Sequence, residues 1–367
     1  MTFFISCDNI IIMKEIMNIL YENGYESYVV GGFVRDYLLG FSSKDIDICT
    51  NAPIDEIIRI FGDRGVSYPK YYAYHIEEDG FTYDITTYRK ELKYRKNKPI
   101  SLEIADDLGT DLLRRDFTIN TFAISKDGLF IDTLGARKDL NSRLIKVVGD
   151  TNKKFKEDKT RILRAIRFAC TLDFDLDRQI LDFISNKNAY LLNEVPKEYK
   201  KNELDKIFDS SGTDKFFFLV KRYGMGKYLN IKFNKIIKSY NRFGIWAQIE
   251  TDLPFPKKER HIIDSIKSLI EKKDINFLDL SLYSSDIIYN AASILGLEKK
   301  VKAFEDIRNL HSIIDMDIDP DVFFKYVRLE DIKKAYKLVE RNIMEGYIQN
   351  NKKSIEKYLK EIRLWVI

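Results

Sequence analysis

Cysteine, histidine and proline are scarce in this chain of 367 residues, which contains three, three and seven of them. The cysteines and histidines are scattered, without the close spacing of a metal site: Cys7, Cys49, Cys170, His75, His261 and His311. An odd, dispersed set of cysteines argues against a disulfide framework, and so few histidines argue against zinc and imidazole chemistry. Any chemistry must therefore rest on other side chains.

Long apolar runs and a strong net charge are also missing. No run approaches the roughly eighteen apolar residues that a membrane span needs, and the segment MTFFISCDNIIIMKEIM has neither a basic start nor a cleavage pattern. We expect a cytoplasmic protein without a membrane partner. Lysine and arginine exceed aspartate and glutamate by only four, at 61 against 57, so any nucleic-acid contact must come from local patches.

Glycines are concentrated near the N-terminus. Eleven of the seventeen precede residue 150, together with short β-rich stretches such as SYVV, DIDICT and GFTYDITTYR. Beyond about residue 153 the apolar spacing becomes mainly helical, as in ILRAIRFACTL. The pattern predicts an α+β N-terminal part followed by an all-α remainder, and a hydrophobic content of 45% is enough for more than one core.

The stretch YVVGGFVRDYLL predicts a strand, a tight turn at Gly31 and Gly32, and a helix that carries Arg35. Two glycines let backbone amides approach a ligand closely, and the unpaired N–H groups at a helix start favour phosphate. Taken alone, a glycine pair is more often ordinary turn geometry. A phosphate site therefore needs support from other residues nearby in the chain.

The next predicted strand, DIDICT, carries Asp45 and Asp47 two residues apart, so both carboxylates point to the same face. Like charges so placed need a compensating cation, and Mg²⁺ prefers carboxylate and phosphate oxygens. A solvated strand face explains the pair about equally well in isolation, but the glycine turn upstream favours metal-dependent phosphoryl transfer. For Asp84, on a further predicted strand, a metal ligand and a local hydrogen-bonding role both stay open.

Four segments follow one another along the chain: GGFVRDYLLG with DIDICT, LLRRDFTINTFAI, DTLGARKDL and EDKTRILRAIRFA. In this order they resemble the bacterial-type (class II) tRNA nucleotidyltransferase and poly(A) polymerase family over about residues 20–210, and most of all its CCA-adding members. The resemblance implies a DNA polymerase beta-like nucleotidyltransferase head followed by an all-α neck, body and tail. We place the head at 1–140, the neck with its base-recognition helix at 141–210, the body at 211–290 and the tail, expected to bind tRNA, at 291–367.

The resemblance also implies a reaction: template-independent, Mg²⁺-dependent addition of CMP, CMP and AMP from CTP and ATP to the 3′ end of tRNA, with release of pyrophosphate. Alternatives are an enzyme that adds only A or only CC, a poly(A) polymerase, and a non-catalytic RNA-binding relative. The last ranks low because Asp45 and Asp47 are present. The segment between Asp84 and Arg114 retains the length of a loop whose shortening marks CC-adding members, which favours complete CCA addition or A addition.

Carried onto this sequence, the resemblance assigns Asp45 and Asp47 to catalysis and to Mg²⁺. With Gly31 from the predicted turn, the residues expected to bind nucleotide are Gly31, Gly32, Arg35, Arg115, Asp158, Arg161, Arg164 and Arg167. Those expected to shape the sugar and phosphate region are Arg114, Asp116 and Asn120. Tyr199 departs from the family, which often has an arginine there, whereas the neighbouring Glu198, Glu203 and Leu204 match.

The motif EDKTRILRAIRFA, residues 157–169, predicts one helix with an apolar side and a charged side. By itself this suits a solvated face with a weak salt bridge between Asp158 and Arg161. The resemblance instead implies that these two residues read the incoming base and that Arg164 and Arg167 also contact the nucleotide. Cytosine and adenine both present an amino donor beside a ring-nitrogen acceptor, and uracil and guanine reverse that pattern, so one carboxylate and one guanidinium can select C and A together.

Overall fold

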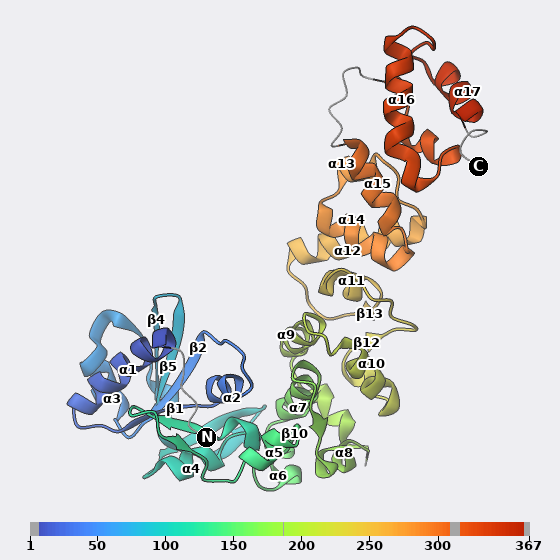
Figure 1. Cartoon of the computed structure of the whole chain (residues 1–367). Helices are drawn as coiled ribbons and strands as arrows, with labels where there is room; N and C mark the ends of the chain where they lie inside the picture. The colour runs from blue at the N-terminus through green and yellow to red at the C-terminus, as the bar shows by residue number, and fades with distance from the viewer. Residues whose placement is uncertain (1–6, 186, 309–315, 363–367) are drawn as a thin grey trace. The chain divides into compact units, whose positions relative to one another are not determined.

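The computed structural model describes residues 7–185, 187–308 and 316–362. It divides the chain into two compact units, Met1–Leu229 and Asn230–Ile367. Every residue assigned above to catalysis or nucleotide binding belongs to the first unit, whose elements are labelled α1 to α10 in Figure 1. His311 lies outside the described residues.

A mixed seven-stranded sheet forms the centre of the head, in the order β3-β4-β5-β2-β1-β8-β9. Its strands are β1 (Ser27–Val30), β2 (Asp45–Thr50), β3 (Gly65–Tyr68), β4 (Ala73–Glu78), β5 (Phe81–Thr87), β8 (Ala123–Ser125) and β9 (Phe130–Ile131). Neighbours are antiparallel except β2 and β5, which run parallel. In β2, Ile46 and Ile48 are buried. The predicted alternation therefore holds, since Asp45 and Asp47 lie on the exposed face.

Five helices and a separate β-hairpin complete the described part of the head. The helices are α1 (Cys7–Glu22), α2 (Gly32–Leu38), α3 (Ile54–Phe61), α4 (Leu108–Leu113) and α5 (Arg137–Asn141). The hairpin pairs β6 (Arg89–Arg95) with β7 (Lys98–Ile104), and β6 contacts α4. A buried cluster that includes Val30, Cys49, Tyr88 and Leu112 connects the sheet, the start of the hairpin and α4.

Helices dominate the rest of the first unit. They are α6 (Thr151–Glu157), α7 (Thr160–Thr171), α8 (Arg178–Ser185), α9 (Lys197–Phe208) and α10 (Thr213–Arg222), and one short parallel pair joins β10 (Leu144–Ile145) to β11 (Asp175–Leu176). α7 contacts α9 and α10. Its apolar side, which includes Ile162, Leu163 and Ile166, is fully buried, as the sequence pattern predicts.

The prediction of one helix over 157–169 is wrong in its first residues. α6 ends at Glu157 and α7 begins at Thr160. Asp158 lies between them with an extended backbone, at a φ of −137°, and its side chain accepts a hydrogen bond from the Thr160 N–H at 3.0 Å. Aspartate favours such capping geometry over a helix interior, so the charged motif is divided between two helices.

The second unit is again mainly helical. Its elements are β12 (Ile231–Lys232), β13 (Glu250–Thr251), α11 (Arg242–Ala247), α12 (Lys257–Lys272), α13 (Asp279–Leu282), α14 (Ser285–Leu295), α15 (Glu298–Arg308), α16 (Ile332–Met344) and α17 (Lys352–Ile362). A hydrophobic core near its C-terminal end contains Phe323, Val339, Ile355 and Leu359. Short 3-10 helices across both units cover Gly62–Arg64, Pro69–Tyr71, Thr118–Asn120, Asn188–Glu194, Gly226–Tyr228, Pro320–Lys325 and Leu329–Asp331.

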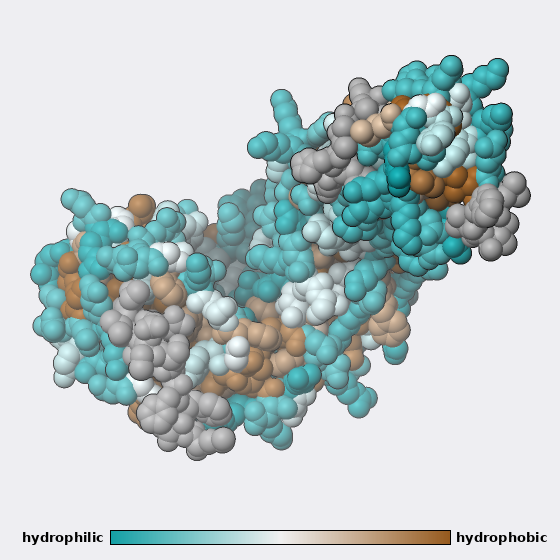
Figure 2. Space-filling model, turned by 45° about the horizontal axis from the view of Figure 1, so that its top comes forward, coloured by the Kyte–Doolittle hydropathy of each residue, from teal (hydrophilic) through white to brown (hydrophobic). Residues whose placement is uncertain are grey.

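The predicted fold class is confirmed, with a mixed-sheet head followed by a largely helical region. Two pairs of two-residue strands, β10–β11 and β12–β13, are additions to the expected all-α part. The first compact unit runs to Leu229, and the finer division at 140, 210 and 290 stays a prediction. None of the described helices is long and apolar enough to cross a membrane, and Figure 2 shows a face covered mostly by hydrophilic residues.

Candidate active site

The turn between β1 and α2 passes very close to two charged side chains. Gly31 has a φ of +78°, and a Cβ atom there would lie 2.9 Å from Asp47 Oδ2 and 3.0 Å from Arg115 Nη1. Only glycine combines this backbone with this approach. The predicted glycine turn is therefore built around Asp47 and Arg115, and Gly32 begins α2 directly after it.

The carboxylates of β2 face a further acid on β5. In the parallel register Asp47 is opposite Asp84, and in the next antiparallel register Asp84 is opposite His75. His75 Nδ1 lies 2.8 Å from Asp84 Oδ1, and this hydrogen bond, more than any other interaction, raises the pKa of His75. Asp84 thus makes the local contact that the sequence left open for it.

Asp47 lies on the exposed face of β2, but the protein atoms that surround its carboxylate partly desolvate it and raise its pKa. The charges of Asp84 and Asp45 act in the same direction, whereas Arg115 and Arg114 oppose them. Within the described residues, no three or more His, Cys, Asp or Glu side chains form a cluster that could hold a metal ion.

The Arg-Arg-Asp segment follows α4 and is fixed by an acid that the sequence analysis missed. Asp111 is fully buried, and its Oδ1 accepts from Arg114 Nε at 2.8 Å while its Oδ2 accepts from Arg115 Nη2 at 3.3 Å. Burial acts to raise the pKa of Asp111, but the two arginines lower it on balance. The i, i+3 and i, i+4 spacing of Asp111 to Arg114 and Arg115, at the end of a helix, was the signal for this contact.

Asp116 connects this segment to α7. Its Oδ2 accepts from Arg164 Nε at 2.8 Å, and its Oδ1 accepts from Asn120 Nδ2 at 2.9 Å. Asn120 Oδ1 in turn accepts from Arg35 Nη1 at 2.6 Å. Residues from α2, the Arg-Arg-Asp segment and α7 are thereby joined in one hydrogen-bonded network.

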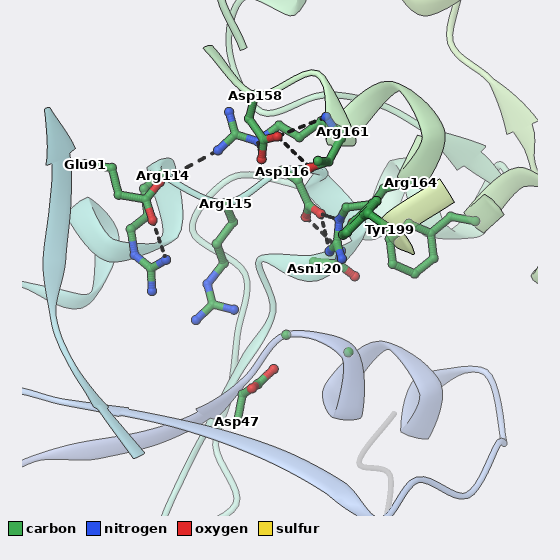
Figure 3. Close-up of a pocket in the computed structure, with 14 residues that line it drawn as sticks. Asp47, Glu91, Arg114, Arg115, Asp116, Asn120, Asp158, Arg161, Arg164 and Tyr199 are labelled. Carbon is green, nitrogen blue, oxygen red and sulfur yellow. Dashed lines mark hydrogen bonds and ion pairs between the residues drawn. The ribbon is translucent and has the colours of Figure 1, made fainter. Parts of the chain in front are cut away.

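Asp158 and Arg161 lie side by side at the start of α7, with 3.8 Å between Asp158 Oδ2 and Arg161 Nε. Arg161 is only 6% exposed, which a solvated surface stripe does not explain. Its Nη2 donates to the Tyr94 hydroxyl at 2.8 Å and lies 3.7 Å from Glu91 Oε2. Glu91 also lies 3.3 Å from Arg114 Nη1, so β6 contacts both arginines (Figure 3).

The β6–β7 hairpin is therefore part of the site, although the sequence analysis identified it only as a loop. At its tip, Asn97 Oδ1 accepts from the Lys159 N–H at 3.1 Å and Asn97 Nδ2 donates to the Glu194 carbonyl at 2.8 Å. Lys96 and Asn97 both have positive φ angles, as a two-residue hairpin turn requires. The alternating segment before Asn97 was the available signal.

These residues surround a cavity of about 420 Å³, a size typical of small-ligand sites. Its lining is Gly31, Gly32, Asp47, Glu91, Arg114, Arg115, Asp116, Asn120, Asp158, Thr160, Arg161, Arg164, Phe168 and Tyr199. Figure 3 shows Arg115 directed toward Asp47, with Asp158 and Arg161 on the other side of Arg115. Elements far apart in the sequence thus bring a carboxylate, a cationic cluster and the predicted base-reading pair to one cavity.

Three predicted site residues do not line this cavity: Asp45, Arg35 and Arg167. Arg35 and Arg167 instead contact the ring of Phe168, with their guanidinium carbons 4.8 and 3.8 Å from its centroid. Arg167 Nε also donates to Glu203 Oε2 at 2.6 Å. Phe168, which the sequence analysis did not single out, thus lines the cavity and also contacts both arginines.

Comparisons with known proteins show which family the chain resembles. A family model described as the poly A polymerase head domain matches residues 27–146. The CCA-adding enzyme of Lactococcus lactis is 37% identical over 220 residues, which cover 59% of this chain and 55% of that protein. The CCA-adding enzyme of Limosilactobacillus reuteri is 40% identical over 198 residues, which cover 53% of this chain and 48% of that protein. These alignments span about half of the relatives' length.

A longer alignment decides the family. The CCA-adding enzyme of Lactobacillus gasseri is 30% identical over 391 residues, which cover 92% of this chain and 94% of that protein. The chain belongs to the CCA-adding enzyme family.

Two solved structures of family members share its fold. That of Bacillus stearothermophilus, in complex with CTP, has a TM-score of 0.70 at 22% identity and covers 96% of this chain and 97% of its own. The structure of the Thermotoga maritima enzyme, complexed with tRNA, has a TM-score of 0.64 at 19% identity. The match covers 98% of this chain and 96% of that chain.

Proposed function

We propose that this chain adds CMP, CMP and AMP, from CTP and ATP, to the 3′ end of tRNA without a nucleic-acid template. The observation that carries the proposal is the convergence of Asp47, Arg115 and the Asp158–Arg161 pair on one cavity. A carboxylate beside a glycine turn at the start of a helix suits phosphoryl transfer, and a carboxylate–guanidinium pair suits recognition of C and A. A cytoplasmic location, where these substrates occur, is part of the proposal.

The acidic pair on β2 fits Mg²⁺. Desolvation and the charges of Asp84 and Asp45 raise the pKa of Asp47 even though Arg115 and Arg114 oppose them, so a bound cation would stabilise the ionised carboxylate. Mg²⁺ needs only one or two protein carboxylates because substrate phosphates and water complete its shell. We propose that Asp45 and Asp47 hold it, and that it supplies charge neutralisation and activation of the attacking hydroxyl when bound.

In this mechanism the chain's own residues orient the reactants. The Gly31–Gly32 turn and Arg115 bind the triphosphate, and Asp111 fixes Arg115. Asp158 and Arg161 pair with the amino group and ring nitrogen of the base. The RNA 3′-hydroxyl then attacks the α-phosphate, and pyrophosphate leaves. Fixed charges and orientation carry most of the rate enhancement in phosphoryl transfer.

The roles of the remaining arginines follow from their contacts. Arg164 lines the cavity and donates to Asp116, so we assign it to nucleotide binding. Direct contact of Arg35 and Arg167 with nucleotide stays a prediction, since the structure shows them packed around Phe168 instead.

The β6–β7 hairpin favours complete CCA addition or A addition over CC addition. It extends from Arg89 to Ile104, and its Glu91 and Tyr94 contact Arg161. The test incubates the protein with Mg²⁺, single nucleoside triphosphates and tRNAs that end before C, after C and after CC, and then sequences the 3′ ends. Addition that stops at CCA supports the proposal; addition only after CC, only up to CC, or as poly(A) assigns one of the alternatives.

A further inference from the structure

Lys154 on α6 binds the end of α4. Its Nζ donates to the carbonyl oxygens of Leu113, Arg114 and Arg115 at 2.9, 3.0 and 3.3 Å. The last carbonyls of a helix lack partners within the helix and form the negative end of its dipole, so an ammonium group stabilises them. The three N–H donors of one lysine are thus matched to three carbonyls, that of the last residue of α4 and those of the two arginines that follow it.

The backbone of the same residue holds the base-reading pair. The carbonyl oxygen of Lys154 accepts from the Asp158 N–H at 3.2 Å and from Arg161 Nη1 at 3.2 Å. Lys154 therefore contacts both members of the pair through its main chain and both arginines of the Arg-Arg-Asp segment through its side chain. It does not itself line the cavity.

We propose that Lys154 is a positioning residue that couples base reading by Asp158 and Arg161 to triphosphate binding by Arg115. This inference rests on the proposed function. Through Lys154, the main chain of Arg115 is joined to α6 and so to the Asp158–Arg161 pair. Because misplacing reacting groups by about 1 Å costs up to about a hundredfold in rate, one such contact is enough to link the two parts of the site.

The charge of Lys154 supports this assignment. Burial, followed by the nearby Arg161 guanidinium, lowers the pKa of Lys154 to about 8, while Glu157, Glu91 and Asp116 act in the opposite direction. Below that pH the ammonium group has a donor for each of the three carbonyls. Above it the neutral amine has only two, so the contact weakens as pH rises.

The test compares K154M and K154R with the wild-type chain, and uses K156M as the matched control because Lys156 is exposed on the same helix. The measurements are KM and kcat for CTP and ATP, the preference over UTP and GTP, and the thermal midpoint. We expect K154M to raise KM for CTP and ATP by about tenfold and to lower the preference by a similar factor. K154R, which keeps charge and donors, should stay within about threefold of wild type, and K156M should match it.

Two outcomes would overturn the inference. In the first, K154M has a lower thermal midpoint but the KM values and nucleotide preference of the wild type, so Lys154 only caps a helix. In the second, K156M is as impaired as K154M. If K154M does not fold, K154Q is measured in its place and should show the same paired losses in smaller size.

Calorimetric binding of CTP and UTP separates failure of this inference from failure of the proposed function, since binding needs no transfer. If the wild-type chain binds CTP more tightly than K154M does but transfers no nucleotide, the proposed reaction is refuted and the coupling stands. If the wild-type chain transfers nucleotides and the K154M substitution leaves the binding of CTP and UTP unchanged, the coupling is refuted and the proposed reaction stands.

Discussion

Arg164 and Asp116 join α7 to the Arg-Arg-Asp segment through a largely buried ion pair, with 2.8 Å between Arg164 Nε and Asp116 Oδ2. Asn120 Nδ2 and the Phe117 N–H donate to the other carboxylate oxygen, at 2.9 and 2.8 Å. Although burial acts to raise the pKa of Asp116, Arg164 and these hydrogen bonds lower it well below its usual range. The carboxylate therefore stays ionised and fixes the arginine at the cavity.

Replacing Asp116 with asparagine should destabilise the protein at neutral pH. The variant keeps the shape of the side chain but removes the charge that faces Arg164, and charge-assisted hydrogen bonds contribute about 1.5–3 kcal/mol. We expect a loss of about 2 kcal/mol in the free energy of unfolding, measured by urea titration. Glu56→Gln is the control, because Glu56 pairs with Arg59 on the open surface and its removal should leave the midpoint unchanged.

The pH dependence of this pair has a definite sign. Because the folded-state pKa of Asp116 lies below the unfolded value, its contribution is fully present above about pH 4 and is lost as pH falls through the folded pKa. The difference in stability between wild type and Asp116→Asn should thus be constant from pH 7 to about 5 and shrink in stronger acid. A difference that grows on acidification contradicts the assignment.

Replacing Gly31 with alanine should impair both stability and transfer. The positive φ alone costs about 1–3 kcal/mol for a residue with a side chain, and the added Cβ would displace Asp47 and Arg115. Gly40→Ala is the matched control, since Gly40 has a φ of +79° with no atom within 4 Å of the added Cβ. Both variants should lose stability, but only Gly31→Ala should lose transfer by about tenfold or more. If both variants lose transfer activity equally, the loss comes from backbone strain and not from displacement of Asp47 and Arg115.

Local patterns predicted the parts of the site that depend on a few adjacent residues. The alternation around Asp45 and Asp47 and the turn at Gly31 were readable because strand periodicity and glycine conformations act over short distances. The apolar side of α7 was readable for the same reason. Asp158 was misplaced within a helix because the three-residue spacing of Asp158, Arg161 and Arg164 continues across the break between α6 and α7.

Contacts between segments far apart in the chain could not be predicted from the sequence. Glu91 and Tyr94 reach Arg161 across about seventy positions of sequence, and no spacing rule connects a strand residue to a helix so far away. Phe168 looked like an ordinary core residue of an amphipathic helix, yet three guanidinium groups surround its ring, those of Arg35, Arg164 and Arg167. Such sites are specified by tertiary packing, which a single sequence does not display.

Asp47→Ala should abolish nucleotide transfer while tRNA binding, measured by gel shift, stays near the wild-type level. A divalent cation and its ligands contribute several kcal/mol to such reactions, so we expect a loss of about a hundredfold or more in kcat. EDTA should stop the wild-type reaction and Mg²⁺ should restore it. Asp127→Asn, an exposed aspartate of the same head, is the control and should remain active. Near-normal transfer by Asp47→Ala would refute the role assigned to β2.

Arg161→Ala should remove the preference for CTP and ATP over UTP and GTP. The guanidinium group lies in a nearly closed environment, at 6% exposure, where an unpaired donor or acceptor on the wrong base is costly. Sites of this kind discriminate by factors of about 10⁴ or more, and loss of one partner should reduce that to about tenfold. Competition between CTP and UTP, read by sequencing the extended tRNA, measures the change.

The matched control for base selection is Arg178→Ala, which removes a guanidinium group whose side chain is 92% exposed and which lies on α8, outside the cavity lining. Asp158→Asn supplies the complementary test, because its amide both donates and accepts and so fits uracil as well as cytosine. If Arg161→Ala lowers kcat for all four nucleotides by the same factor and leaves their ratios intact, Arg161 orients the nucleotide without reading it. If the ratios collapse in both variants but not in Arg178→Ala, the carboxylate and the guanidinium together act as the template.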